Sequence, residues 1–175
     1  MVNHPASDQA AGPVVCETAE ASTAVVRGSV PITGLRDFFD NSFRLLPQVI
    51  AGQGAAVQGA AFCLYRESSE APAPDAAVDL ELGFAVDCVV QAQDGVMPGR
   101  LPAGDVARYV YAGGFDGLGS AWERLRSWIG EQGREAGPLR WEVYRTQPTP
   151  DMDPSELRTE LNWLLATAAG TASRS

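Results

Sequence analysis

The segment Trp141-Glu142-Val143-Tyr144-Arg145 repeats the pattern of Phe62-Cys63-Leu64-Tyr65-Arg66, which lies 79 residues earlier in the chain. Glu81-Leu82-Gly83-Phe84 returns at the same spacing as Glu160-Leu161-Asn162-Trp163. Two segments that keep one register indicate that the chain contains a similar structural unit twice. The repeat therefore predicts two tandem units related by a pseudo-twofold axis, with a groove for a ligand between them.

Apolar spacing predicts the same order of elements, β-α-β-β, in each unit. In unit one we expect a strand over residues 23–30, a helix with apolar positions from Leu35 to Ile50, and strands over residues 57–67 and 78–90. Unit two has a strand over 105–112, a helix over 118–129, and strands over 139–146 and 157–166. Pro47 predicts a break in the first helix at residues 44–46. The predicted fold is α+β, with antiparallel sheets and the two main helices on their outer side.

Composition sets the domain bounds. Residues 1–21 are rich in Ala, Ser, Pro and Glu, which predicts a disordered tail. We expect residues 22–167 to form one domain, with unit one at 22–93 and unit two at 104–167. The connector between the units, residues 94–104, holds two prolines and three glycines. Residues 168–175 are expected to be a frayed tail.

Charge and apolar patterning restrict the partners and the compartment. The 175 residues carry 13 basic and 22 acidic side chains, a net charge of −9, which disfavours nucleic acid and anionic membranes and favours cationic partners. We find no signal peptide and no apolar stretch long enough to span a bilayer. Cys16, Cys63 and Cys88 show no CxxC spacing, so neither a disulfide framework nor a zinc site is indicated. We expect a cytoplasmic protein.

The catalytic repertoire is narrow. The single histidine, His4, lies in the predicted tail, which disfavours Ser-His-Asp and Cys-His systems and most transition-metal sites. The glycine-rich stretch 113–119 lacks both the Lys-Ser/Thr end of a P-loop and the GxGxxG spacing. We therefore expect no metal and no cofactor, and any chemistry must use carboxylates, tyrosines or water.

Side-chain alternation along residues 139–146 separates two faces of a strand. Trp141 and Val143 share one face, and Glu142 and Tyr144 share the other. If the apolar face packs on the helix, then Glu142 and Tyr144 point away from the helix layer. Cys63 and Tyr65 lie on the matching face of unit one. The two faces together predict a pocket with one carboxylate near its middle.

Other residues carry two interpretations. Tyr109, Tyr111, Trp163 and Phe84 either line the groove or pack under the helices, and Trp122 and Trp128 fit a core. Glu81 and Glu160 each match a structural pair with a nearby arginine. Glu142 itself could be a sheet carboxylate paired with Arg140, Arg145 or Arg158.

The motifs in unit two resemble a known family. Trp141-Glu142-Val143-Tyr144, a proline turn, Arg158-Thr159-Glu160-Leu161-Asn162-Trp163, and the earlier Gly113-Gly114-Phe115-Asp116-Gly117-Leu118 are similar in order and spacing to the GyrI-like small-molecule-binding domain. This domain is also the effector-binding part of AraC-type and MerR-type multidrug regulators. The resemblance covers roughly residues 23–166.

The resemblance implies roles for particular residues. The family's buried carboxylate, which meets cationic aromatic ligands, maps onto Glu142, and its tyrosine maps onto Tyr144. The family's usual Gly-Pro-Tyr is Gly113-Gly114-Phe115 in this chain, which removes a hydroxyl group. The candidate ligand-binding residues are thus Glu142, Tyr144, Tyr65, Cys63, Tyr109, Tyr111, Trp163, Phe84 and Phe115.

Three functions follow as hypotheses. The preferred one is a free-standing protein that binds bulky aromatic, cationic compounds in multidrug sensing or sequestration, because a buried carboxylate is stabilised by a cation and aromatic walls attract it. The alternative is a hydrolase that opens cyclopropane-bearing DNA-alkylating compounds with Glu142 and Tyr144 as catalytic residues, as some members of the family do. A DNA gyrase inhibitor is the weaker alternative.

Overall fold

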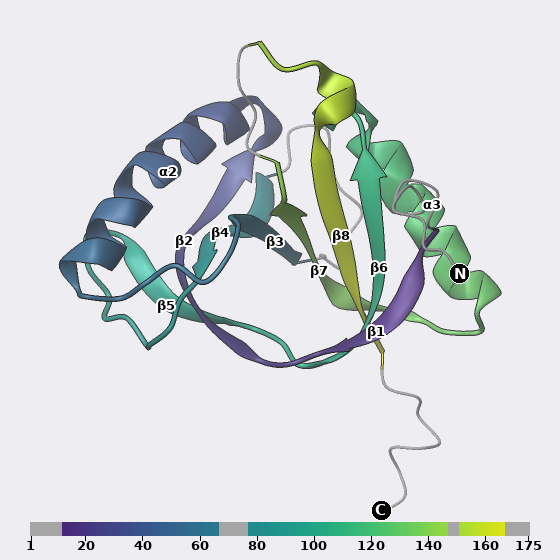
Figure 1. The fold of residues 1–175 in the computed structure, drawn as a ribbon, viewed down its shortest axis with the longest axis horizontal. Helices are drawn as coiled ribbons and strands as arrows, with labels where there is room; N and C mark the ends of the chain where they lie inside the picture. Colours follow the sequence, from purple (N-terminus) through teal and green to yellow (C-terminus); the bar gives the residue numbers. More distant parts are fainter. Residues whose placement is uncertain (1–11, 67–76, 147–150, 167–175) are drawn as a thin grey trace, which may run out of the picture.

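The computed structural model describes residues 12–66, 77–146 and 151–166. The described residues form one sheet and two main helices (Figure 1). In chain order the elements are β1 (Val14–Thr18), β2 (Ala21–Pro31), η1 (Ile32–Gly34), α2 (Leu35–Gly52), β3 (Phe62–Arg66), β4 (Ala77–Ala85), β5 (Val96–Leu101), β6 (Gly104–Ala112), η2 (Phe115–Gly117), α3 (Leu118–Glu131), β7 (Ala136–Tyr144), η3 (Pro154–Glu156) and β8 (Arg158–Leu165).

The strands form a single antiparallel sheet in the order β1-β6-β8-β7-β3-β4-β2-β5. The α+β class is confirmed, but the expected separate sheets are joined into one. They are joined because β3 pairs with β7, which places Cys63 opposite Glu142 and Tyr65 opposite Arg140. The centre of the sheet is therefore built from the two segments whose patterns repeat.

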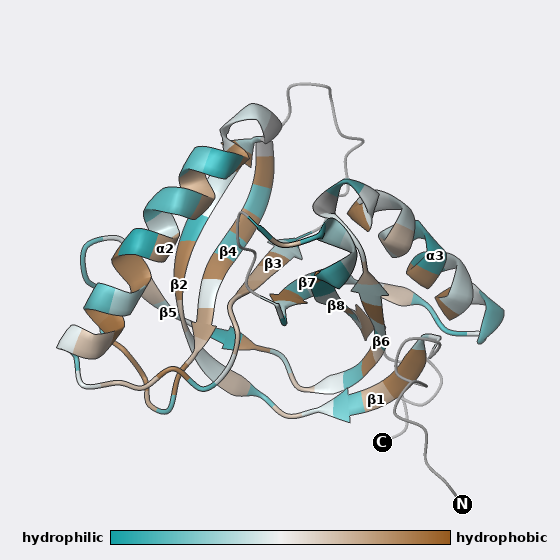
Figure 2. Cartoon of the chain, turned by 45° about the horizontal axis from the view of Figure 1, so that its top comes forward, coloured by the Kyte–Doolittle hydropathy of each residue, from teal (hydrophilic) through white to brown (hydrophobic). Residues whose placement is uncertain are grey.

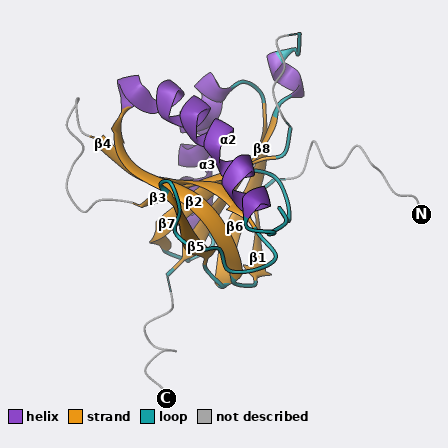
Figure 3. Cartoon of the chain, turned by 90° about the vertical axis from the view of Figure 1, so that its left-hand side faces the viewer, coloured by secondary structure: helices purple, strands orange, loops and turns teal. Residues whose placement is uncertain are grey.

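Both helices pack on the same face of the sheet, which we call the helix face (Figure 3). Hydrophobic residues recur at helical spacing along each helix, with hydrophilic residues between them, as an amphipathic helix requires (Figure 2). Leu46 and Ile50 of α2 pack with Ala24 of β2, and Leu125 of α3 packs with Leu161 of β8. Burying each such leucine contributes about 1.5–3 kcal/mol. Within the described residues, neither helix is long and apolar enough to cross a membrane.

The opposite face of the sheet, which we call the helix-free face, is buried as well. Phe62, Leu64 and Trp141 of the central strands pack there with Val25 of β2 and Val106 of β6. Residues from both outer strands, including Cys16 of β1 and Met97 and Leu101 of β5, join the same cluster. The sheet therefore curls away from the helices, so that residues of its two edge strands, β1 and β5, pack in one cluster with residues of the central strands.

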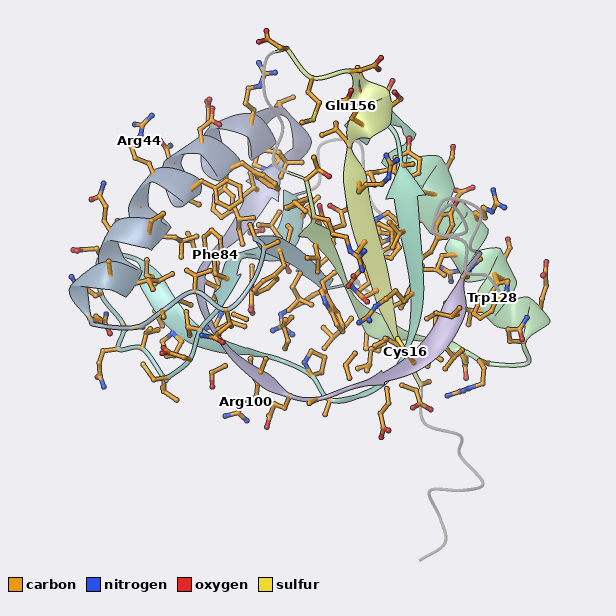
Figure 4. The ribbon with its side chains drawn as sticks, viewed as in Figure 1. Cys16, Arg44, Phe84, Arg100, Trp128 and Glu156 are labelled. Carbon is orange, nitrogen blue, oxygen red and sulfur yellow. The ribbon has the colours of Figure 1, made fainter. Side chains whose placement is uncertain are left out.

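Helix α2 runs without interruption from Leu35 to Gly52, so the break predicted at residues 44–46 is wrong. Pro47 is exposed, while Leu46 and Ile50 on either side of it are buried. The burial of one apolar face through the proline position offsets the lost backbone hydrogen bond. Arg44, on the outward side of the same helix, extends toward solvent (Figure 4).

Two strands occupy segments that the sequence assigned to a tail and a connector. Strand β1 lies within predicted tail residues 1–21 and pairs with the edge of β6, and Cys16 packs on the helix-free face. Strand β5 lies within the predicted connector and pairs only with β2, an edge position that tolerates Pro98. Predicted tail residues 1–11 and 168–175 lie outside the described residues.

Ion pairs flank the core of the helix-free face. Glu81 accepts contacts from Arg66 at 2.7 Å and Arg27 at 3.1 Å, as expected for a structural pair. Glu160 accepts a hydrogen bond from Nε of Arg145 at 3.0 Å and forms an ion pair with Nε of Arg108 at 3.3 Å. Each of these two buried carboxylates is thus neutralised by two guanidinium groups, and the predicted arginine pairing of Glu81 and Glu160 is confirmed.

The close approach of β2 and β4 at Gly83 gives a test of the fold. A Cβ at position 83 would overlap the carbonyl oxygen of Ala24, which is backbone and cannot rotate away. We expect Gly83→Ala to reduce the free energy of unfolding by at least about 2 kcal/mol, as overpacking does. Urea denaturation measures this change. The control is Gly130→Ala in α3, where an added Cβ meets nothing within 4 Å; it should stabilise by about 0.5–1 kcal/mol. Equal midpoints for the two variants would contradict the packing described for β2 and β4.

Candidate functional site

The candidate site is centred on Glu142, in the middle of the sheet on strand β7. Glu142 is only 4% exposed to solvent. Glu142 and Tyr144 lie on the helix face, because Glu142 contacts Trp122 of α3 and the ring of Tyr144 lies 6.4 Å from that of Phe39 of α2. The prediction that these two side chains point away from the helix layer is therefore wrong.

The error has a physical cause. Alternation correctly separates Glu142 and Tyr144 from Trp141 and Val143, but it does not tell which face the helices cover. The prediction places the apolar face, with Trp141 and Val143, against the helices. The curled sheet buries Trp141 in the hydrophobic cluster of the helix-free face instead. The face that carries Glu142 and Tyr144 is therefore the one that meets α2 and α3.

Three neutral donors hold the Glu142 carboxylate. Tyr144 Oη donates to Oε1 at 2.8 Å, and Tyr65 Oη donates to the same oxygen at 3.2 Å. Trp122 Nε1 donates to Oε2 at 2.9 Å. Tyr65 reaches Glu142 diagonally, because Glu142 is paired with Cys63, two residues before Tyr65 on β3. The donors come from α3, β3 and β7, so this contact ties the two units to one carboxylate.

Burial raises the pKa of the Glu142 carboxyl above its ordinary value of 4.5. The hydrogen bonds from Trp122, Tyr144 and Tyr65, and then the charge of Arg140, lower this pKa and oppose the effect of burial. Neutral donors compensate a buried carboxylate less than a paired cation does. The site therefore has unused capacity to stabilise a positive charge.

The neighbouring groups keep their protons at neutral pH. Burial, first of all, raises the pKa of the Cys63 thiol to about 12. Burial followed by the nearby Glu142 charge raises the pKa values of Tyr65 and Tyr144 well above 10. Cys63 is thus a buried thiol and not an activated nucleophile.

The arginines proposed as alternative partners of Glu142 have different contacts. Arg145 pairs with Glu160, and Arg158 donates to the backbone oxygens of Ser155 and Leu157. Arg140 lies on the helix face and turns its guanidinium group toward aromatic rings. None of the three donates a hydrogen bond to Glu142 among the residues that the structure describes.

The remaining predicted site residues are placed apart from the carboxylate, with one exception. Trp163 packs against Trp122 at 5.4 Å between ring centroids and so lies beside the site. Tyr109 and Tyr111 pack beside α3 and line a separate hollow of about 260 Å³ with Gly117 and Arg124. Phe84 packs under α2, 6.1 Å from the ring of Phe43 (Figure 4). For Phe115 the structure describes the backbone, which begins η2.

Two aromatic residues at the site were not among the predicted ones. Trp122 was interpreted as core, and it is buried, but its indole N–H also holds Glu142. A buried indole N–H needs an acceptor, and this requirement is the signal that could have identified it. Phe39 of α2 covers Tyr144 from the other helix. In the described ranges, no cluster of three His, Cys, Asp or Glu side chains is placed to hold a metal ion.

Comparison with known families gives one match. The GyrI-like small molecule binding domain matches residues 13–165, which is most of the chain. Comparison with curated protein sequences gives no match.

Solved structures share the fold. The crystal structure of the EcmrR C-terminal domain has a TM-score of 0.74 at 18% identity, over 89% of this chain and 98% of that one. A hydrolase encoded by lin2189 from Listeria innocua has a TM-score of 0.64 at 10% identity, over 89% and 92%. SAV2435 bound to tetraphenylphosphonium has a TM-score of 0.60 at 10% identity, over 93% and 97%. At these identities the likeness shows the fold alone.

The raised pKa of Glu142 predicts a pH-dependent stability. A carboxyl whose pKa is higher folded than unfolded stabilises the fold below the unfolded value of 4.5, and this stability is lost as pH rises through the folded pKa. Glutamine resembles the protonated form, so we expect Glu142→Gln to gain stability relative to wild type as the pH rises above 4.5 and until it passes the folded pKa, by about 1.4 kcal/mol for each unit of the raised pKa.

Chemical denaturation at several pH values measures this difference. The control is Glu156→Gln, which removes an exposed carboxylate at η3. A pH-independent difference between wild type and Glu142→Gln would show that the carboxyl is not perturbed by burial.

Proposed function

The chain belongs to the GyrI-like small molecule binding domain family, and we propose from this premise that it binds bulky aromatic cations in multidrug sensing or sequestration. The observation that carries the proposal is the Glu142 carboxylate, buried at the centre of the sheet and held only by neutral donors among the described residues. Glu81 and Glu160, in contrast, are each paired with two arginines. Glu142 is thus the buried carboxylate that gains most from an incoming positive charge.

The surroundings of Glu142 favour a delocalised cation. Such a cation sheds its water at lower cost than a compact ammonium does, and it gains about 0.5–2 kcal/mol from each good contact with an aromatic face. Tyr65, Tyr144, Trp122, Trp163 and Phe39 supply these faces. Because the walls are mostly apolar and few polar atoms dictate orientation, the site tolerates ligands of different shape.

A ligand reaches Glu142 by moving side chains aside. The carboxylate is nearly closed off, and the hydroxyls of Tyr65 and Tyr144 occupy one of its oxygens. These phenols can rotate from Oε1 and leave it to the cation, whose positive charge then compensates the buried carboxylate. SAV2435, a protein of the same fold, is bound to tetraphenylphosphonium, a cation with four aromatic rings. That complex supports the proposed ligand class for this chain.

A pair of ligands that differ mainly in charge tests the proposal. Methyltriphenylphosphonium is a cation and triphenylphosphine oxide is its neutral counterpart of similar size. We expect Glu142→Gln to weaken the cation at least about tenfold, equivalent to about 1.4 kcal/mol, and to change the affinity for the oxide by less than about threefold. Isothermal titration calorimetry measures both affinities.

The matched control is Glu123→Gln, which removes one negative charge from the exposed side of α3. This variant should bind both ligands like wild type, which separates a local effect of Glu142 from long-range attraction by the net charge. Equal losses of cation and oxide in Glu142→Gln, or absence of binding by the wild type, would overturn the proposal.

A second candidate function is hydrolysis of cyclopropane-bearing DNA-alkylating compounds. It is favoured by the 2.8 Å contact between Tyr144 Oη and Glu142 Oε1, which places a phenol and a carboxylate within the reach that acid-base catalysis requires. Glu142 would take a proton from the water that attacks a cyclopropane carbon, a carbon–carbon bond of the ring would break, and Tyr144 would donate a proton to the oxygen of the compound that receives the released electron pair. The hydrolase from Listeria innocua has the same fold.

Incubation with a cyclopropane-bearing alkylator, followed by mass spectrometry, decides between binding and turnover. Turnover gives a product heavier by one water, and Glu142→Gln should abolish it while Tyr144→Phe slows it at least about hundredfold. Recovery of unchanged compound from the wild type would exclude hydrolysis of that compound and leave binding as the proposed function.

A further inference from the structure

Arg140 lies beside the buried carboxylate, two residues before Glu142 on the same strand. The two side chains share the helix face because strand residues alternate with period two. The direct neighbours of Arg140 across the sheet are Tyr65 on β3 and Trp163 on β7's other partner, β8. The register therefore brings a cation into the aromatic surroundings of the carboxylate.

Three aromatic rings surround the Arg140 guanidinium group. Its Cζ lies 4.8 Å from the ring centroid of Trp122, 5.0 Å from that of Trp163 and 5.8 Å from that of Tyr65. These distances are within the range of cation–π attraction. We call these three residues the aromatic cage. The cage thus already holds a planar, delocalised cation that belongs to the protein itself.

The aromatic cage and the carboxylate are parts of one site. Trp122 directs its indole N–H to Oε2 of Glu142 and a ring face to Arg140. Tyr65 likewise donates to Oε1 and contributes its ring to the cage. A ligand cation drawn to Glu142 would meet the same faces that Arg140 occupies.

The guanidinium group is incompletely bonded in the cage. Its Nε atom is buried and has no hydrogen-bond partner among the described residues. An unsatisfied buried donor is costly, which makes this placement less stable than one with a full set of partners. An arginine kept only for structure would be expected to pair like Arg66 or Arg145, each of which donates to a buried glutamate.

We propose that Arg140 is a specificity-determining residue whose guanidinium group occupies the cation subsite of the pocket and competes with the ligand for the aromatic cage beside Glu142. This inference rests on the proposed binding function. It names the ligand group that the cage accepts: a weakly hydrated, delocalised cation such as a guanidinium, an amidinium or an arylphosphonium. Binding exchanges one cation for another, and the displaced side chain extends toward solvent on its flexible stem.

Chemical complementation tests the competition directly. Arg140→Ala removes the side chain, and ethylguanidinium carries the missing head group. We expect Arg140→Ala to bind ethylguanidinium measurably by calorimetry while wild type does not, and to bind methyltriphenylphosphonium about tenfold more tightly than wild type. The matched control is Arg124→Ala, which removes an arginine lying 5.6 Å from the ring of Tyr109 in the separate hollow beside α3. This control should behave like wild type with both compounds.

Arg140→Met supplies a second readout if the alanine variant does not fold. Methionine keeps an apolar stem but removes the charge, so it should tighten phosphonium binding without creating a site for ethylguanidinium. Unchanged phosphonium affinity in both folded Arg140 variants, or an equal gain in Arg124→Ala, would overturn the competition. If neither wild type nor any variant binds a cation, the proposed function fails and this inference fails with it.

Discussion

The structure depends on the burial of one carboxylate at the centre of an eight-stranded sheet. Glu142 is acceptable there only because three donors converge on it from two strands and a helix. Each of these donors has to be positioned by its own element, so the pairing of β3 with β7 and the seating of α3 are both coupled to this side chain. A requirement of local chemistry thereby constrains how the two units are joined.

The chain treats its buried glutamates in two different ways. Glu81 and Glu160 lie on the helix-free face, where arginines with partly exposed side chains neutralise them and stabilise the scaffold. Glu142 lies on the helix face among aromatic rings and receives only neutral hydrogen bonds within the described residues. The first arrangement favours rigidity and the second leaves a negative charge incompletely compensated. This difference, more than the depth of burial, distinguishes the candidate site at Glu142 from the structural ion pairs of Glu81 and Glu160.

The positive charge of Arg140 helps to compensate the buried charge of Glu142. The charge of the guanidinium group lowers the pKa of Glu142, although burial and the three hydrogen bonds have larger effects on it. The group packs on aromatic rings and forms no hydrogen bond with the carboxylate among the described residues. A cation held by π faces can be exchanged, whereas one held by a bidentate ion pair is fixed in place. The chain shares its fold with EcmrR and SAV2435, and the selectivity proposed for it rests on its own side chains.

The repeated segments by themselves determined the α+β class, the order of elements in each unit, and the pairing of Glu142, Tyr144, Cys63 and Tyr65 on one face, because periodicity and register are local properties of a chain. Tertiary structure decided the rest. It joined the units into one sheet through β3 and β7, made strands of segments 14–18 and 96–101, and let α2 continue through Pro47. It also decided which face meets the helices, since the sheet buries both faces by curling, and alternation cannot distinguish two buried faces. Tertiary structure also chose the partners of Trp122 and Arg140, because these partners lie on elements distant along the chain.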